Sequence, residues 1–348
     1  MCCSVSIGPS AAGQQKKQKK KNKQKGKINE DVEDPQELVL KNVCALLNTG
    51  GGILVIKITD FQSLSKNSVD EFWKKIAPRL SAMITSSLTY DEVFDRLEVF
   101  DEVLLFIRAP QHFCTLKYNL FLPSDECAYE ASYEQTLKQL EKHPSQRGKK
   151  KNPFPIKVPL NILPPVPKMF EYQQSLSFHE TKQMQFKHWE SETYLDHNNH
   201  GQRQSIGRWI SAFANGGGGI ILLGITDEGC VLGQELNQKN RQEDIEDRVS
   251  SLFNKMVCDL TLERKTNWDM EFFPVVGRES HAVIVIYVAG MASCGGVFTN
   301  CPKSFELKFG EDGNKGPCEL DFRGWKERML SGMDLKSSGK GLRRVSLP

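Results

Sequence analysis

The chain has 348 residues, and 46 basic against 43 acidic side chains give it a formal net charge of +3. The first 30 residues hold eight lysines and one acid, a charge of +7, so the rest carries 38 basic and 42 acidic groups, a charge of −4. At 39% hydrophobic residues and ~100–200 residues per domain we expect two folded units. No apolar run approaches the ~20 residues of a membrane-spanning helix, and none of the ten cysteines forms a CxxC pair. Integral membrane proteins, collagens, coiled coils and disulfide-rich miniproteins are therefore excluded, and we expect reduced thiols in the cytosol or nucleus.

Residues 1–34 are too poor in apolar side chains to build a core, so we expect a disordered basic arm. Its lysines, from Lys16 to Lys27, alternate with Gln and Asn, a composition typical of a flexible RNA-binding tail and equally of a nuclear localisation signal. The expected location is cytoplasmic, with the nucleus as the alternative through this cluster.

The first folded lobe is predicted over residues 35–143 and the second over 170–331. In chain order the first lobe is predicted to contain a helix ending at 43–47, a strand at 53–58, a helix at 70–83, a strand pair at 97–108 and a helix at 133–143. The second is predicted to contain a helix ending at 209–214, a strand at 220–225, a helix at 242–256, strands at 268–275 and 282–288, and a helix at 322–329. A proline-rich basic linker, 144–169, joins them, and 332–348 is a flexible tail.

An internal repeat relates the two lobes. Residues 45–60 (ALLNTGGGILVIKITD) and 212–227 (AFANGGGGIILLGITD) are identical at nine of 16 positions at a constant offset of 167. In each copy an apolar helix stops at an asparagine followed by glycines, and a β-branched strand follows. A phosphate-binding loop would need the reverse order, strand before glycines, so a tight turn with close helix–sheet packing is the preferred reading over a nucleotide site.

The repeat resembles the divergent Alba-type domain. Its duplication, with LSFHETKQMQFK at 176–187 leading into the second copy, resembles the schlafen family over residues 35–331, and the lack of a Walker A motif and helicase region suggests a short form. The resemblance implies an α+β fold, in which two related Alba-like lobes form a U-shaped core with a positively lined groove. It also implies binding of structured RNA, chiefly tRNA, which some family members cleave at a metal-dependent site of three carboxylates.

The three catalytic positions implied by the resemblance are Glu180, Gln185 and Asp227. Glu180 and Asp227 would hold Mg²⁺ or Mn²⁺ through hard carboxylate oxygens. A neutral amide at position 185 supplies no charge, so metal binding should weaken, unless Glu190 or Glu192 compensates through a shifted register. Without the resemblance, Glu180 and Asp227 would be taken for ordinary surface acids at strand ends.

A conventional structural zinc site, which the resemblance places near the end of the second lobe, is not expected. The aligned residues are Met256, Cys258 and Cys294 with Gly295, which lack two of the four ligands. Cys301 or His281 could substitute, but the alternative is that Cys258 and Cys294 are small buried hydrophobes. The loop histidines His197 and His200 are more typical of a solvated loop than of a metal site.

Basic side chains near the carboxylate segment are the candidate RNA contacts in the groove. They are Lys182, Lys187, Arg203 and Arg208, together with Lys149, Lys150 and Lys151 of the linker. The expected function is RNA binding, tRNA above all, with reduced or absent nuclease activity. The alternatives are an active metal-dependent endoribonuclease and a growth-regulatory protein-interaction factor without an RNA role, and the oligomeric state stays open.

Overall fold

The computed structural model describes residues 2–7, 34–58, 66–85, 87–110, 112–124, 127–141, 158–188, 206–236, 242–259, 261–291, 296–309 and 315–331. Within these ranges no helix is both long and apolar enough to cross a membrane. The chain divides into two compact units, the first made of 1–117 and 303–348 and the second of 118–302. Each is a mixture of helices and strands, so the α+β class is confirmed.

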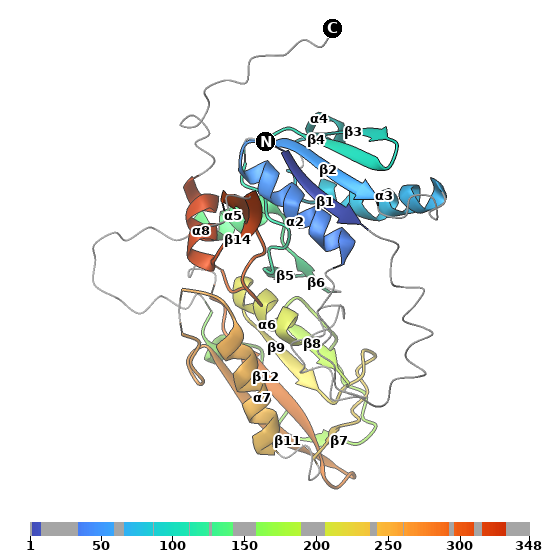
Figure 1. Cartoon of the computed structure of the whole chain (residues 1–348). Coiled ribbons are helices and arrows are strands. Elements are labelled where there is room, and N and C mark those ends of the chain that lie inside the picture. Colours follow the sequence, from blue (N-terminus) through green and yellow to red (C-terminus); the bar gives the residue numbers. More distant parts are fainter. Residues whose placement is uncertain are drawn as a thin grey trace, which may run out of the picture. The chain divides into compact units, whose positions relative to one another are not determined.

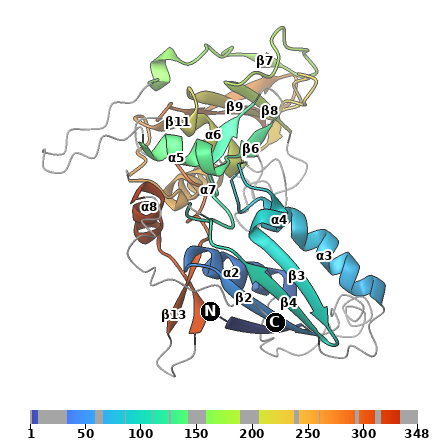
Figure 2. The same ribbon diagram turned by 90° about the horizontal axis from the view of Figure 1, so that it is seen from above.

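The first unit is built around a four-stranded sheet of order β1-β2-β4-β3. Its elements are β1 (Cys2–Ile7), α2 (Pro35–Asn48), β2 (Gly52–Ile58), α3 (Lys66–Ser81), α4 (Tyr90–Val93), β3 (Phe94–Val99), β4 (Glu102–Ile107), β13 (Phe305–Phe309), β14 (Lys315–Glu319) and α8 (Phe322–Ser331). Strand β1 runs parallel to β2 (Figure 1), whereas β4 is antiparallel to β2 and β3 (Figure 2). Helix α2 packs its apolar side into the core of this unit, from Val39 to Leu47, against Leu54 and Leu105.

The second unit is built around a sheet of order β7-β11-β12-β9-β8, with β10 paired to β12. Its elements are β5 (Phe121–Pro123), β6 (Ala128–Glu130), α5 (Tyr133–Glu141), the 3-10 helix η2 (Leu160–Ile162), β7 (Phe170–Glu171), β8 (Met184–Lys187), α6 (Ile206–Asn215), β9 (Gly219–Leu223), β10 (Gln234–Glu235), α7 (Gln242–Lys255), β11 (Trp268–Val276) and β12 (His281–Val288) (Figure 1). Alternate residues of β9 pack into different hydrophobic cores on the two faces of the sheet. Ile221 packs with residues of α6 and α7, whereas Ile220 packs with Phe170 and Leu176.

The predicted helices and strands are all confirmed within a few residues, but three features differ from the expectation. Cys2–Ile7, expected within the disordered arm, forms strand β1. The later part of the predicted linker is packed, because Val158 pairs with Gly290 and Leu163 is buried in a core of the second unit. The hairpin and helix at 121–141 group with the second unit, and those at 305–331 group with the first.

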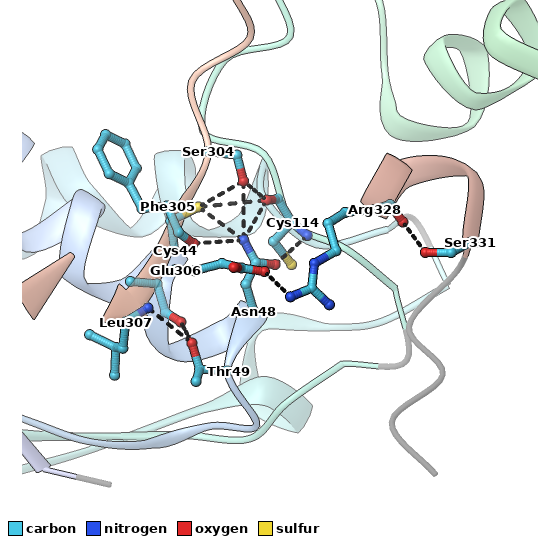
Figure 3. A network of polar contacts seen from close by, with 11 residues as sticks. Cys44, Asn48, Thr49, Cys114, Ser304, Phe305, Glu306, Leu307, Arg328 and Ser331 are labelled. Carbon is cyan, nitrogen blue, oxygen red and sulfur yellow. Dashed lines mark hydrogen bonds and ion pairs between the residues drawn. The ribbon is translucent and has the colours of Figure 1, made fainter. Parts of the chain in front are cut away.

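The repeated asparagines hold these regrouped segments in place. In the first unit, Asn48 Oδ1 accepts from the Cys114 N–H at 2.7 Å, and its Nδ2 donates to the carbonyls of Cys114 and Phe305 at 2.9 and 3.0 Å (Figure 3). Asn48 and Cys114 are both buried. The amide thus joins α2 to the chain after β4 and to the start of β13.

Asn215 makes the corresponding set of bonds within the second unit. Its Oδ1 accepts from the Val297 N–H at 2.7 Å, and its Nδ2 donates to the carbonyls of Val297 and Phe121 at 2.8 and 3.2 Å. Here the amide joins α6 to the chain after β12 and to the start of β5. Both sets give a buried backbone N–H, that of Cys114 or of Val297, its acceptor, whereas the carbonyls of these two residues also accept from Ser304 and Ser211.

The glycines of the repeat allow close approach of two backbones. Gly51 has a φ of +81°, and a Cβ there would lie 2.5 Å from the Ile107 carbonyl oxygen at the end of β4. Gly218, at the equivalent position, has a φ of +75°, and its Cβ would lie 3.0 Å from the Val288 carbonyl oxygen at the end of β12. Glycine is required at both positions by conformation and by space.

Candidate functional site

Strand β8 positions the candidate site in the second unit. Side chains alternate along a strand. Met184 and Phe186 point into the core that contains Leu176, so Gln185 and Lys187 share the opposite face. All four side chains are buried, which is unusual for a glutamine and a lysine.

Lys187 lies between the two predicted metal-binding carboxylates. Its Nζ is 3.2 Å from Glu180 Oε1 and 3.4 Å from Asp227 Oδ1, and it lies 6.0 Å from the centre of the Trp209 ring. The side chain of Lys187 is only 9% exposed, whereas those of Glu180 and Asp227 are 22% and 62% exposed. Because burial weakens screening by water, the attraction of the ammonium for the Glu180 carboxylate is stronger here than at the surface, whereas its attraction for the exposed Asp227 carboxylate is more screened.

The Glu180 carboxylate is fixed by a second bond from the strand itself. The backbone N–H of Phe186 donates to Glu180 Oε1 at 2.8 Å. The chain therefore turns back between Glu180 and β8, a turn closed by the backbone bonds between Thr181 and Met184. One carboxylate oxygen thus accepts from both the strand backbone and the lysine, which holds it beside the ammonium that also contacts Asp227.

Gln185 is fully buried and only half satisfied. Its Nε2 donates to the Thr181 carbonyl at 3.2 Å, but its Oε1 has no hydrogen-bond partner among the residues that the structure describes. An unpaired buried amide oxygen costs about 1–3 kcal/mol. Such an oxygen is a chemically suitable neutral ligand for a hard cation. However, the Lys187 ammonium offsets one of the two carboxylate charges, so Glu180, Asp227 and Lys187 together carry −1.

Residues 180–294 match the family model described as "Schlafen, AlbA_2". The chain carries a schlafen AlbA_2 domain. The match begins at Glu180 and includes Gln185, Lys187 and Asp227, and it supports the predicted membership in the schlafen family. It also points to a function related to nucleic acids.

The predicted RNA contacts differ in their surroundings. Lys182 is exposed on the turn before β8, whereas Lys187 is buried among the carboxylates. Arg208, on α6, lies over the Phe121 ring with its guanidinium carbon 5.1 Å from the ring centre. Outside the described residues lie the other predicted contacts and compensating acids, which are Arg203, Lys149, Lys150, Lys151, Glu190 and Glu192, as well as His197 and His200.

Among the residues weighed for a zinc site, Met256 is buried and Cys258 packs against the core that contains α6 and α7. His281 Nδ1 lies 2.8 Å from the Glu279 carbonyl oxygen, and Cys294 lies outside the described residues. The described ranges contain no group of three His, Cys, Asp or Glu side chains arranged to hold a metal ion. The absence of a conventional zinc site stays a prediction.

Lys187, predicted as a phosphate contact, instead lies between the two carboxylates. The sequence held a signal for it, because Met184 and Phe186 are apolar and a strand then places Gln185 and Lys187 together on the other face. Only the folded chain shows that this face also meets Glu180 and Asp227.

Proposed function

We propose that this protein binds structured RNA, with tRNA as the leading candidate, and that its nuclease activity is reduced or absent. The reduced nuclease activity is inferred from the Lys187 ammonium, which lies between Glu180 and Asp227, and from the neutral amide of Gln185 on the same strand. A site with three carboxylates and one lysine would carry −2, whereas this one carries −1. The missing charge lowers the affinity for a divalent cation.

If a metal ion is bound, Glu180 and Asp227 would hold it, with the unpaired Oε1 of Gln185 as a neutral third ligand. Bound Mg²⁺ or Mn²⁺ would polarise a phosphate oxygen. Metal binding would require a rearrangement of the side chains that now contact the carboxylates. Lys187 must turn away from at least one carboxylate, and it would then be placed to contact a phosphate oxygen itself. An active endoribonuclease is therefore the second candidate, favoured by the unpaired Gln185 oxygen.

The binding mode that we propose is electrostatic and based on shape. Outside the lysine arm the chain has a charge of −4, so its net charge there cannot attract RNA. Clustered lysines and arginines must supply the contacts, to phosphates and to 2′-hydroxyl groups of an A-form stem, with little reading of bases. We infer further that the two repeat-bearing units are related Alba-like lobes and that RNA lies in a groove of the U-shaped core. This inference is supported by the matching contacts of Asn48 and Asn215.

The proposal is tested with purified protein and labelled tRNA. Filter binding is measured between 50 and 200 mM salt, and cleavage is followed on gels with Mn²⁺ present. We expect binding that weakens steeply with salt and few or no fragments. Manganese-dependent fragments that disappear in Glu180→Ala would contradict the loss of nuclease activity. An affinity that does not change with salt would contradict the phosphate-contact mode.

A further inference from the structure

Two lysines lie directly opposite each other on paired chain segments in the first unit. Lys117 and Lys303 form an antiparallel bridge, in which the Lys303 N–H donates to the Lys117 carbonyl at 2.8 Å and the Lys117 N–H to the Lys303 carbonyl at 3.4 Å. Directly opposed residues place their Cβ atoms ~4.5–5.5 Å apart on the same side of a ladder, and like charges there are destabilising. The backbone therefore holds the two ammonium-bearing side chains near each other.

Two helices add charges to this pair. Arg79 of α3 forms an ion pair with Glu37 of α2. Lys41 lies one turn after Glu37 on α2, and its Nζ is 5.6 Å from the centre of the Phe305 ring, two residues after Lys303. These five side chains, four cations and one carboxylate, together carry a charge of +3.

The charges of this cluster act on one another. Burial raises the pKa of Glu37, but the hydrogen bond and charge of Arg79, together with the charges of Lys117 and Lys303, outweigh burial and hold the pKa below its usual value. All five side chains lie in half-buried residues, so their charges are only partly screened by water. By contrast, Lys74 and Lys75 of α3 are exposed.

We propose that Lys117 and Lys303, supported by Arg79 and Lys41, form a phosphate-binding site and that in function it takes backbone phosphates of RNA. An anion placed between the two lysines offsets their mutual repulsion and gains two charge-assisted hydrogen bonds. Glu37 has a positioning role, because its ion pair fixes the Arg79 guanidinium beside the cluster. The assignment to RNA rests on the function proposed above, whereas the phosphate chemistry does not.

The test compares the double variant Lys117→Gln/Lys303→Gln with a control of equal charge, Lys74→Gln/Lys75→Gln. Filter binding of tRNA is measured over 50–200 mM salt for both variants and for the native chain. Each lost phosphate contact lowers the slope of log K against log salt by ~0.7–0.9, so the site variant should lose about 1.4–1.8. Over this fourfold salt range its affinity would then change about tenfold less than that of the native chain. The control should keep the native slope.

A second measurement does not depend on RNA. Thermal unfolding is followed with and without sodium tripolyphosphate, against NaCl of equal ionic strength. We expect a rise of a few degrees for the native chain and for the control, and none for the site variant. Without ligand, the site variant should melt no lower than the native chain, because the repulsion between the two lysines is gone.

The outcomes separate the two proposals. A tripolyphosphate effect that needs Lys117 and Lys303, in a protein that does not bind tRNA, would support the site and contradict the proposed function. Binding of tRNA with a native slope in the site variant would overturn the site and leave the proposed function standing. Poly-glutamate binding that depends equally on the two lysines would overturn the assignment to phosphate.

Discussion

Gln185→Glu restores the charge that the candidate site lacks, and its effect on stability can be worked out from the contacts of Gln185. The side chain is fully buried, and its Nε2 donates to the Thr181 carbonyl. A carboxylate cannot donate, so the substitution loses this bond, turns two acceptors toward each other and buries a negative charge. Unsatisfied buried groups cost about 1–3 kcal/mol and charged ones more, with Lys187 on the same face as a partial offset. We expect a loss of about 2–3 kcal/mol in the absence of divalent cations.

Mn²⁺ should reverse this loss, because the variant offers three carboxylates in place of two. Ligand at 100 times its Kd stabilises the folded state by about 2.7 kcal/mol. The assay is thermal unfolding in EDTA and in Mn²⁺. A loss of 2–3 kcal/mol corresponds to a shift of about 5–10 °C in Tm for a unit of this size. The same Mn²⁺ should produce new or stronger cleavage of tRNA.

Gln183→Glu is the matched control for this experiment. Gln183 also donates to a backbone carbonyl, that of Gly217 at 3.2 Å, but its residue is exposed. A carboxylate there stays hydrated, and we expect a change within about 0.5 kcal/mol. If Gln185→Glu were as stable as the native chain in EDTA and indifferent to Mn²⁺, the position would not face a cation site and the reasoning would be refuted.

Three further predictions concern individual buried side chains. Asn48→Ala and Asn215→Ala should each lower the free energy of unfolding by about 2 kcal/mol in urea titrations, since each removes the acceptor of one buried N–H, while the Cys114 and Val297 carbonyls keep the Ser304 and Ser211 hydroxyls as donors. Lys187→Met should raise the affinity for Mn²⁺ in calorimetry, because the ammonium that offsets the charges of Glu180 and Asp227 is removed. Burial raises the pKa of the Cys44 thiol to about 11, so a thiol reagent at neutral pH should label exposed Cys127 and reach Cys44 only on unfolding.

The raised pKa of Cys44 also predicts that the free energy of unfolding falls at high pH. The folded state keeps the thiol proton more tightly than the unfolded state does, so this group's contribution is complete below the unfolded pKa of about 9. It is lost as the pH rises from about 9 to about 11. The free energy of unfolding of the native chain should therefore fall more steeply over this range than that of Cys44→Ala.

The local elements were predictable because their signals are local. Asn48 and Asn215, each followed by glycines and a β-branched run, predicted both helix ends and both strands. Strand β1 was missed because six residues before a lysine run carry no periodic signal, and the strand exists through its pairing with β2. The grouping of 121–141 and 305–331 with the other repeat's unit depends on distant backbone bonds, which no local pattern encodes.

The candidate site was predictable only in part. The family resemblance gave Glu180, Gln185 and Asp227, but the position of Lys187 between the carboxylates depends on how the chain turns before β8. The pair of Lys117 and Lys303 is joined by a bridge between residues far apart in the sequence. Their charges could be read from the sequence, whereas their register could not.

The register of the edge strands explains why the candidate site occurs in the second unit although both units contain the repeat. β1 is parallel to β2 as β8 is parallel to β9, and at the repeat offset of 167 their partners coincide: Leu54 corresponds to Ile221 and Ile56 to Leu223. Cys3 therefore occupies the register position of Gln185, and Val5 that of Lys187. The glycine-rich turn and its strand are a scaffold shared by both units. The chemistry depends on the strand laid beside that scaffold, so exchanging β8 residues should alter the site while leaving the helix–turn–strand packing intact.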